Sequence, residues 1–393
     1  MKLELQSAAK AKTEDRQANW NVILGENGDG KTSLLQGIAA CLMDATTADR
    51  MLRPDGWVRR GAKYGALDAT LVPEQNDSVD MLNGTADVPR RVAYRLVKLG
   101  PTESLVRPSE DHKDLYPEDF GRLVEDSDYL YKYAFGGSKP SVGWFSAGYG
   151  PFRRPSIDLG EGRSLTERRF STLFNEGAPI VDCESWLLEM DRQALRRHGK
   201  ADGQEAAQTL ASCKSALVAL LPDIKDVRVE EGVRFISKDG KEQSLDQLSH
   251  GYRSVFALAV DILRWARASM TNWKKQLHEA RGVVLVDEID THLHPTWQRQ
   301  VGFMLCQTFP NLQFIVTSHS PFVAMAAAPG GLTVLKRNPA DGTVTAHQDM
   351  PDIRGWAAGR VLTELFDMES LHDPRTETKL ARYEELRTRI RSG

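Results

Sequence analysis

Residues 25–35 read GENGDGKTSLL and follow directly on the apolar run WNVIL of residues 20–24. Gly25 and the triplet GKT at residues 30–32 satisfy the pattern G-x-x-x-x-G-K-[ST] of a phosphate-binding P-loop. In such a loop the glycines let backbone N–H groups surround phosphate oxygens, the lysine adds a positive charge, and the hydroxyl binds Mg²⁺. A glycine turn at a helix start is the structural alternative. The strand pattern before the loop and the helix pattern after it favour the P-loop.

The hydrophobic pattern around this loop predicts an α/β fold. Residues 19–24 have the pattern of a buried strand, and residues 31–43 have that of a helix. Alternating apolar runs between residues 56 and 98 predict antiparallel strands beside this strand and helix. Residues 101–131 are acidic and hold few strong apolar runs, so we expect a loop or a helical excursion there.

The second half of the chain returns to an α/β pattern. Residues 183–221 have helical spacing and end before Pro222. Strand and helix patterns alternate from residue 248 to 323, which indicates a parallel α/β core, and the heptads are too few for a long coiled coil. We therefore expect an N-terminal lobe with the antiparallel region (1–180), a helical insertion with short strands (181–247), a C-terminal lobe (248–340) and a helical tail (341–393).

The composition is that of an ordinary globular protein. A hydrophobic fraction of 41% and a charged fraction of 27% argue against disorder, and a net charge of -3 gives no overall attraction to nucleic acid. The four cysteines form no CxxC pair, so we expect reduced thiols rather than disulfides or a zinc site. No signal peptide and no run of about 18 apolar residues is visible, which predicts a cytoplasmic protein without a membrane segment.

A second strand pattern ends in a pair of acidic residues. The run GVVLV at residues 282–286 leads into Asp287 and Glu288. Because ligands bind at the carboxyl ends of central parallel strands, we expect Asp287 to hold Mg²⁺. Glu288 is then placed to polarise an attacking water. Acidic pairs are also common in loops, and the P-loop upstream is what favours the catalytic interpretation.

Two further stretches follow the order of a nucleotide site. Residues 248–252 read LSHGY and stand before an apolar helix pattern, for which a serine-capped helix start is the alternative. The strand pattern QFIVT at residues 313–317 leads into His319. A lone histidine is more often structural, but this one follows a strand, a threonine and a serine downstream of the acidic pair.

The order of these four motifs resembles that of ABC-type ATPases. LSHGYRS resembles the LSGGQ-type signature, with His250 replacing a glycine and Tyr252 replacing the glutamine, and His319 matches the switch histidine. LVDEIDTHLHPTWQ and FPNLQFIVTSHSPFV are similar to the soluble branch related to the SMC, RecF and overcoming-lysogeny (OLD) proteins. That branch includes the ATPase subunits of Septu and retron-associated anti-phage systems, and the tail GWAAGRVLTELFDMES resembles the Septu-like ATPases.

The resemblance implies that this α/β fold is an ABC-type P-loop ATPase head, with a mixed sheet, an antiparallel β subdomain and helical insertions. It implies Glu288 as the catalytic base, His319 as the sensor of the γ-phosphate, and Thr32 with Asp287 as the Mg²⁺ ligands. The implied ATP-binding residues are Gly25, Asn27, Gly28, Gly30, Lys31, Thr32 and Ser33 of the P-loop, with Ser249 and Gly251 of the signature.

The resemblance also implies a pair of subunits. In this fold the signature cannot reach its own P-loop, so a complete site needs two protomers head to tail around two ATP molecules. We therefore expect a homodimer or a higher even-numbered oligomer, with residues 290–294 forming the D-loop region at the interface. The alternation of His292 and His294 is compatible with a metal site, but a loop conformation before Pro295 is the favoured explanation.

Two features depart from the family pattern. No glutamine has a convincing Q-loop context, and its place is taken by residues 145–154. We expect Arg153 or Arg154 to lie near the nucleotide or to transmit its state, with a solvated or salt-bridged arginine as the equal alternative. The first strand of the family is unclear within residues 1–16, which leaves the adenine-binding residues unassigned.

The purpose of the hydrolysis is a hypothesis in two forms. The first is a switch that regulates a separate effector in bacterial anti-phage defence, such as an HNH-type nuclease, because this chain shows neither an HNH motif nor room for a Toprim domain. Nucleic acid would then be contacted through the complex. The second is a RecF-like or SMC-like ATPase of DNA repair or chromosomes that binds DNA directly. A transporter ATPase is disfavoured by the missing Q-loop context. Candidates for direct DNA binding are Arg192, Arg196, Arg197, Lys274 and Lys275.

Overall fold

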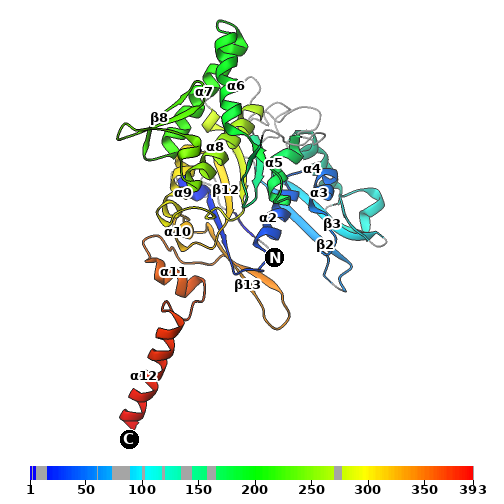
Figure 1. Cartoon of the computed structure of the whole chain (residues 1–393). Helices are drawn as coiled ribbons and strands as arrows, with labels where there is room; N and C mark the ends of the chain where they lie inside the picture. Colours follow the sequence, from blue (N-terminus) through cyan, green and yellow to red (C-terminus); the bar gives the residue numbers. More distant parts are fainter. Residues whose placement is uncertain are drawn as a thin grey trace.

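A six-stranded sheet runs through the middle of the molecule in the computed structural model (Figure 1). Its order is β14-β13-β1-β12-β11-β5, in which β14 pairs antiparallel with β13 and the other five strands are parallel. The sheet is therefore mixed, and the predicted α/β fold class is confirmed. The strands are β1 (Trp20–Leu24), β5 (Trp144–Tyr149), β11 (Arg281–Val286), β12 (Leu312–Thr317), β13 (Leu332–Arg337) and β14 (Val344–His347).

The structure describes most of the chain. The described residues are 1, 3–5, 16–59, 61–72, 89–99, 102–116, 120–133, 144–156, 165–269 and 277–392.

Both faces of the central sheet are covered, which explains why its strands are continuous apolar runs. Along β1, Val22 and Leu24 enter one hydrophobic core while Ile23 enters the other. β11 and β12 alternate in the same way. Helices that contribute to the first core are α6 (Cys183–Arg196), α7 (Ala201–Leu220), α8 (His250–Ser269) and α9 (Pro295–Thr308). Helices that contribute to the second are α2 (Lys31–Ala40), α3 (Ala45–Leu52) and α5 (Leu165–Phe174).

Smaller sheets flank the central one. The predicted antiparallel strands are present as β2 (Tyr64–Leu71) and β3 (Arg90–Leu99), joined by β4 (Thr102–Val106). A second antiparallel sheet holds β8 (Ile224–Val229), β9 (Val233–Ser237) and β10 (Glu242–Ser244), and β6 (Pro155–Ser156) pairs with β7 (Ile180–Val181). Short 3₁₀ turns are η1 (Arg16–Asn19), η3 (Glu110–Leu115), η4 (Leu245–Gln247) and η5 (Leu277–Glu279).

Two expectations about local structure were wrong in part. The acidic segment after residue 100 contains the strand β4 as well as the helix α4 (Phe120–Tyr133). The strand was missed because an acidic residue within it suggested an exposed loop. Glu103 is in fact buried, and its carboxylate accepts a 3.0 Å hydrogen bond from the backbone N–H of Val58. The helix predicted over residues 31–43 ends at Ala40, and α3 starts after Asp44, which caps it through the Thr47 N–H.

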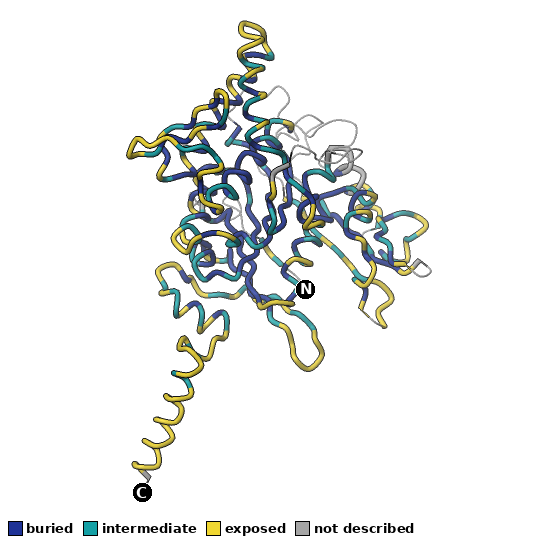
Figure 2. Tube along the Cα trace, viewed as in Figure 1, coloured by how far each residue is buried: buried dark blue, intermediate teal, exposed yellow. Residues whose placement is uncertain are grey.

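The described N-terminal residues contact the body of the protein, whereas the last helix projects from it. At the N-terminus, Glu4 exchanges two hydrogen bonds with the Gln348 side chain, of 2.8 and 2.9 Å, and residues 2 and 6–15 lie outside the described part. At the C-terminus, α10 (Pro321–Ala324) and α11 (Ala358–Leu365) pack on the body, whereas α12 (Pro374–Ser392) projects from it and is exposed along its length (Figures 1 and 2). Within the described residues, no helix combines the length and the apolar character needed to cross a bilayer.

The turn after β5 gives a stability test. A Cβ on Gly150 would lie 2.1 Å from the carbonyl oxygen of Thr172, so we expect Gly150→Ala to destabilise the protein by about 2 kcal/mol or more. Chemical denaturation measures this. The matched control is Gly121→Ala in α4, where a Cβ meets open space and alanine favours the helix. Equal stabilities of the two variants would show that β5 and α5 are not packed as described.

Candidate functional site

The loop between β1 and α2 has the backbone geometry of a phosphate cradle. Gly28 and Gly30 have φ angles of 87° and 79°, in the left-handed region that favours glycine. No side chain caps α2 at its N-terminus, so the N–H groups of its first turn are available to an anion. Gly25 is buried where the loop leaves β1, and Asn27 and Ser33 are exposed on the two sides of the turn.

The Lys31 ammonium lies within this loop. Its Nζ donates hydrogen bonds of 2.9 Å to the carbonyl oxygens of both Gly25 and Glu26. Burial lowers the pKa of Lys31, and the negative charges of Asp29 and Asp287 oppose that shift. An ammonium that is partly removed from water attracts phosphate oxygens more strongly than a fully solvated one. The position of Lys31 therefore fits a polyphosphate.

An arginine from a distant part of the sequence braces the loop. Arg337, at the end of β13, donates from Nη2 to the carbonyl oxygen of Gly28, 309 residues earlier in the chain. Its Nε lies 3.6 Å from Oδ1 of Asp29, whose other carboxylate oxygen accepts the Glu26 N–H at 2.8 Å. Sequence reasoning missed Arg337 because only the pairing of β13 with β1 brings it to the loop.

Asp287 joins the P-loop to the neighbouring strands. Its Oδ2 accepts a 2.6 Å hydrogen bond from the Thr32 hydroxyl, and its Oδ1 accepts one from the Thr317 hydroxyl. The Thr317 oxygen in turn accepts the backbone N–H of Glu288 at 2.8 Å. Thr32 and Asp287 thus present adjacent oxygen atoms, which is the ligand type that Mg²⁺ prefers.

Glu288 has an uncommon backbone conformation. Its φ of 44° is one that a residue with a side chain adopts mainly where its surroundings enforce it. The strand end before it is fixed by the Asp287 N–H, which donates to the Tyr149 carbonyl oxygen at 2.8 Å. The Glu288 carboxylate accepts a 3.1 Å hydrogen bond from the Thr291 hydroxyl and is only half-buried. The structure therefore places this carboxylate beside Asp287 and leaves it accessible.

The His319 loop and the predicted D-loop region form one hydrogen-bonded unit. Ser318 donates to Asp290 Oδ1 at 2.6 Å, and Ser320 donates to Gln298 Oε1 at 2.7 Å. Gln298 also donates to the carbonyl oxygen of residue 293 at 2.9 Å. His319 lies half-buried between the two serines, so a displacement of its loop reaches residues 290–293 directly.

His292 and His294 behave as loop residues. His292 has a φ of 68°, and the His294 Nδ1 accepts the Thr296 N–H at 3.3 Å as the cap of α9. Within the described ranges, no three His, Cys, Asp or Glu side chains are grouped to hold a metal ion. Both residues take part in the loop and helix-cap conformation around Pro295.

Of the two arginines expected near the nucleotide, Arg153 is buried and Arg154 is exposed. The Arg153 Nη2 lies 3.5 Å from the Glu288 carbonyl oxygen, and its Nε donates to the Ser254 hydroxyl on α8 at 3.2 Å. Burial lowers the pKa of Arg153 to about 10, against the effect of nearby carboxylates, the first of which is Asp287. Arg153 thus stays cationic at neutral pH and links the Glu288 loop to the signature helix.

The signature residues lie at the start of α8. Ser249 is exposed, and its hydroxyl accepts the Tyr252 N–H at 3.4 Å. Gly251 is buried against the D-loop region, where a Cβ would lie 3.1 Å from the His292 carbonyl oxygen. The glycine therefore allows the signature and the D-loop region of one chain to pack closely, while Ser249 remains open to a second molecule.

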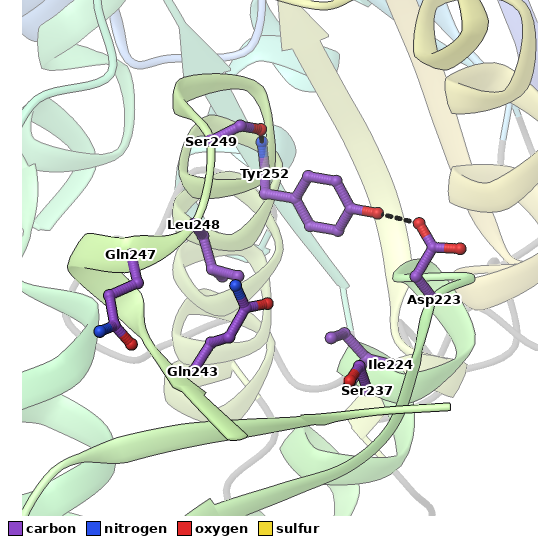
Figure 3. Close-up of a pocket in the computed structure, with 8 residues that line it drawn as sticks. All are labelled: Asp223, Ile224, Ser237, Gln243, Gln247, Leu248, Ser249 and Tyr252. Carbon is purple, nitrogen blue, oxygen red and sulfur yellow. Dashed lines mark hydrogen bonds between the residues drawn. The ribbon is translucent and has the colours of Figure 1, made fainter. Parts of the chain in front are cut away.

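Tyr252 replaces the signature glutamine and lines a pocket behind the signature (Figure 3). Its hydroxyl donates to the Asp223 carboxylate, and its ring lies 4.3 Å from the Trp297 ring. Burial and Asp223 raise the pKa of Tyr252, so the hydroxyl stays protonated. The pocket has a volume of about 220 Å³ and is lined by Asp223, Ile224, Ser237, Gln243, Gln247, Leu248, Ser249 and Tyr252.

The residues considered for direct DNA binding give little support to a basic face. Arg192 and Arg197 pair with acidic side chains close by in sequence, and Arg196 is exposed beside them. Lys274 and Lys275 lie outside the described residues. These arginines therefore fit a solvated helix end.

Comparison with known proteins supports the resemblance drawn from the motifs. Residues 106–326, more than half of the chain, match the family described as "AAA domain, putative AbiEii toxin, Type IV TA system". The chain is 26% identical over 360 residues to "Septu protein PtuA" of Bacillus mycoides (strain KBAB4), covering 90% of this chain and 41% of that protein. It is 24% identical over 357 residues to "Retron Vc95 probable ATPase" of Vibrio cholerae serotype O1 biovar El Tor, covering 80% and 68%.

Among solved structures, the SMC head domain from Thermotoga maritima aligns with a TM-score of 0.43 at 15% identity, over 84% of this chain and 90% of that one. The chain spans less than half the length of the Septu relative. The family match begins after the P-loop, so the assignment of that loop rests on its own motif and geometry.

The Thr317 hydroxyl belongs to the hydrogen-bonded group of Thr32, Asp287, Thr317 and the Glu288 N–H, which we call the junction. Its removal tests what the junction contributes to stability. Thr317→Val keeps the shape of the side chain but leaves the Glu288 N–H without its acceptor and removes a donor to Asp287. We expect a loss of about 1–2 kcal/mol in the free energy of unfolding, measured by chemical denaturation. Thr70→Val on the exposed face of β2 is the control and should be close to neutral. If both variants match the parent protein, the junction contributes nothing to stability.

Proposed function

The chain belongs to this AAA-domain family, and from that premise we propose that it is an ATP-hydrolysing switch that closes with a second copy of itself around two ATP molecules. The observation that carries the proposal is the junction in which Thr32 of the P-loop, Asp287 and Thr317 share hydrogen bonds beside Glu288. It unites a phosphate-binding loop with two carboxylates at one edge of the sheet. We also propose that the segments 1–180 and 248–340 act as the two lobes of the ATPase, with 181–247 as an insertion. The segment 341–393 would act as a tail, although its strand β14 pairs with β13 in the central sheet.

Each part of the junction has a chemical task in this proposal. Lys31 would exchange its contacts with the Gly25 and Glu26 carbonyl oxygens for phosphate oxygens, assisted by the N–H groups of the P-loop. Thr32 and Asp287 would hold Mg²⁺, which neutralises charge on the phosphates. Glu288 would accept a proton from the attacking water, and ADP and phosphate would be the products. The structure fits this assignment because both the oxygen donors and the ammonium lie at the loop.

The second copy would supply the signature. Ser249 is exposed at the N-terminus of α8, where a helix end attracts negative charge. Gly251 keeps that helix close to the D-loop region, which is bonded to the His319 loop. We propose that His319 senses the γ-phosphate and that Ser249 and Gly251 contact the nucleotide bound by the opposite P-loop. ATP would then favour the closed pair, and hydrolysis would release it.

We propose a regulatory use for this cycle. Relatives of the chain carry the names Septu protein PtuA and Retron Vc95 probable ATPase. By that similarity the chain would control a separate effector, such as an HNH-type nuclease, in bacterial anti-phage defence. The chain covers only part of the Septu relative, so this role needs a separate test. The experiment measures whether cells lose protection against phage when Lys31→Ala disables the P-loop.

The hydrolysis step is tested by Glu288→Gln, which keeps the size of the side chain and removes the base. We expect ATP hydrolysis to fall by about 10²–10⁴-fold. ATP binding should be retained, and the closed pair should accumulate, as measured by phosphate release and by mass in solution. Glu231→Gln in the exposed turn between β8 and β9 is the matched control and should keep full activity. Unchanged hydrolysis by Glu288→Gln would refute the assignment of the base.

A further inference from the structure

The helix α12 (Pro374–Ser392) projects from the body of the protein and is solvent-exposed along its length (Figures 1 and 2). In proteins, most of the stability of a helix comes from the packing of one face against other elements. Four of its apolar side chains are nevertheless exposed, Leu380 by 44%, Tyr383 by 61%, Leu386 by 48% and Ile390 by 81%. The helix therefore presents an apolar surface that the rest of the described chain does not cover.

These four side chains form a stripe. Leu380, Tyr383, Leu386 and Ile390 recur at intervals of three and four residues, which places them along one side of the helix. We call this set the α12 stripe. A single apolar residue on a surface needs no explanation, but an aligned row on an unsupported helix is typical of a helix that binds in a groove.

The charges on α12 are mainly basic. The helix holds six basic residues and three glutamates, while the whole chain has a net charge of -3. By helical spacing, Arg375 and Arg382 lie along one edge of the stripe and Arg387 along the other. Glu385 lies on the opposite side of the helix. Glu377 and Glu384, three residues before and four residues after Leu380, lie beside that part of the stripe, and Lys379 falls within the stripe. A surface that covers the stripe therefore meets basic side chains at both edges.

This charge pattern disfavours a second α12 as the occupant. If Tyr383, Leu386 and Ile390 take the a, d and a positions of a heptad, Arg382 and Arg389 take g and Arg387 takes e. A parallel pair would then bring Arg382 against Arg387 of the other copy. An antiparallel pair would bring Arg382 against Arg389 of the other copy. Like charges face one another in both arrangements, and this opposes self-association.

We propose that α12 is the docking element for a partner protein whose apolar groove or helix is edged with carboxylates. The partner would cover the α12 stripe, and its carboxylates would pair with the arginines at the two edges. The three glutamates of α12 disfavour an anionic membrane surface as the occupant.

Two packed helices connect α12 to the predicted switch loop. The preceding helix, α11, is anchored by the buried residues Val361 and Leu365, and it packs on α10. α10 begins at Pro321, and its N-cap residue Ser320 is next to His319. A partner held on α12 would thus sit two helices, α11 and α10, away from the predicted switch loop. Docking itself does not rest on the proposed ATP hydrolysis, because the stripe lies outside the P-loop site.

The test uses the full chain and two designed helical peptides of three heptads, which both have leucine at a and d. One has glutamate at e and g, and the other has lysine. Fluorescence anisotropy should show that the acidic peptide binds at least about tenfold more tightly than the basic one, and that salt weakens it. Binding should fall by a similar factor in Tyr383→Ser/Leu386→Ser and in Arg382→Glu/Arg387→Glu. Glu385→Ala, on the opposite side of the helix, should bind like the parent chain.

Several results would overturn the proposal. These are equal affinity for the two peptides, no binding of the acidic peptide, or binding that survives the stripe substitutions. Self-association that depends on Tyr383 and Leu386 would identify a second copy as the occupant instead. Retention of the chain on phosphatidylserine vesicles, without affinity for the acidic peptide, would identify a membrane surface. Thermal unfolding of each variant verifies that the body stays folded, and Lys31→Ala should bind the peptide normally even if the ATPase assignment fails.

Discussion

The hydroxyl of Thr317 fixes the arrangement on which the candidate site depends. The strand β12 lies between β1, which leads into the P-loop, and β11, which leads into the acidic pair. Thr317 ends that middle strand, donates to Asp287, and accepts the N–H of Glu288. Because Asp287 also accepts from Thr32, one short chain of hydrogen bonds crosses three parallel strands. The unusual φ of Glu288 is sustained by the same contacts, so the position of its carboxylate follows from the order of the sheet.

Electrostatics reinforces this arrangement. Two cations, Lys31 and Arg153, are buried near the carboxylates of Asp287, Glu288 and Asp290. Burial lowers the pKa of each cation, and the carboxylates oppose the shift. The pKa of Arg153, at about 10, keeps that side chain charged near neutral pH. The two cations differ in what they join. Lys31 closes the P-loop on itself, whereas Arg153 ties the Glu288 loop to the helix that carries the signature. Arg153 therefore connects the loop beside the proposed nucleotide site to the surface that a second protomer would meet.

Much of this site is readable from the sequence because its parts are local. The P-loop, the acidic pair and the strand before His319 are each short runs in which residue type and spacing carry the chemistry. Contacts made through space were not predictable in this way. Arg337 reaches the P-loop only through the pairing of β13 with β1. The sequence did not distinguish Arg153 from Arg154, whereas in the structure Arg153 is buried and Arg154 is exposed. The strand β4 was hidden by an acidic residue that turned out to be a buried hydrogen-bond acceptor. A helical tail was expected over residues 341–393, but this range also contains the strand β14, whose partner β13 is in the central sheet. The isolation of α12 depends on the fold of the body and is not visible in the sequence.

The central claim is that each ATP site combines the P-loop of one protomer with the signature of another, and a mixing experiment tests it most directly. Lys31→Ala disables the P-loop and Ser249→Arg obstructs the signature, so neither variant alone should hydrolyse ATP above background. In a mixture, a mixed pair contains one site in which both parts are intact. Random exchange should therefore restore on the order of a quarter of the parent activity. A mixture that stays inactive, although tagged subunits show that mixed pairs have formed, would contradict the composite site.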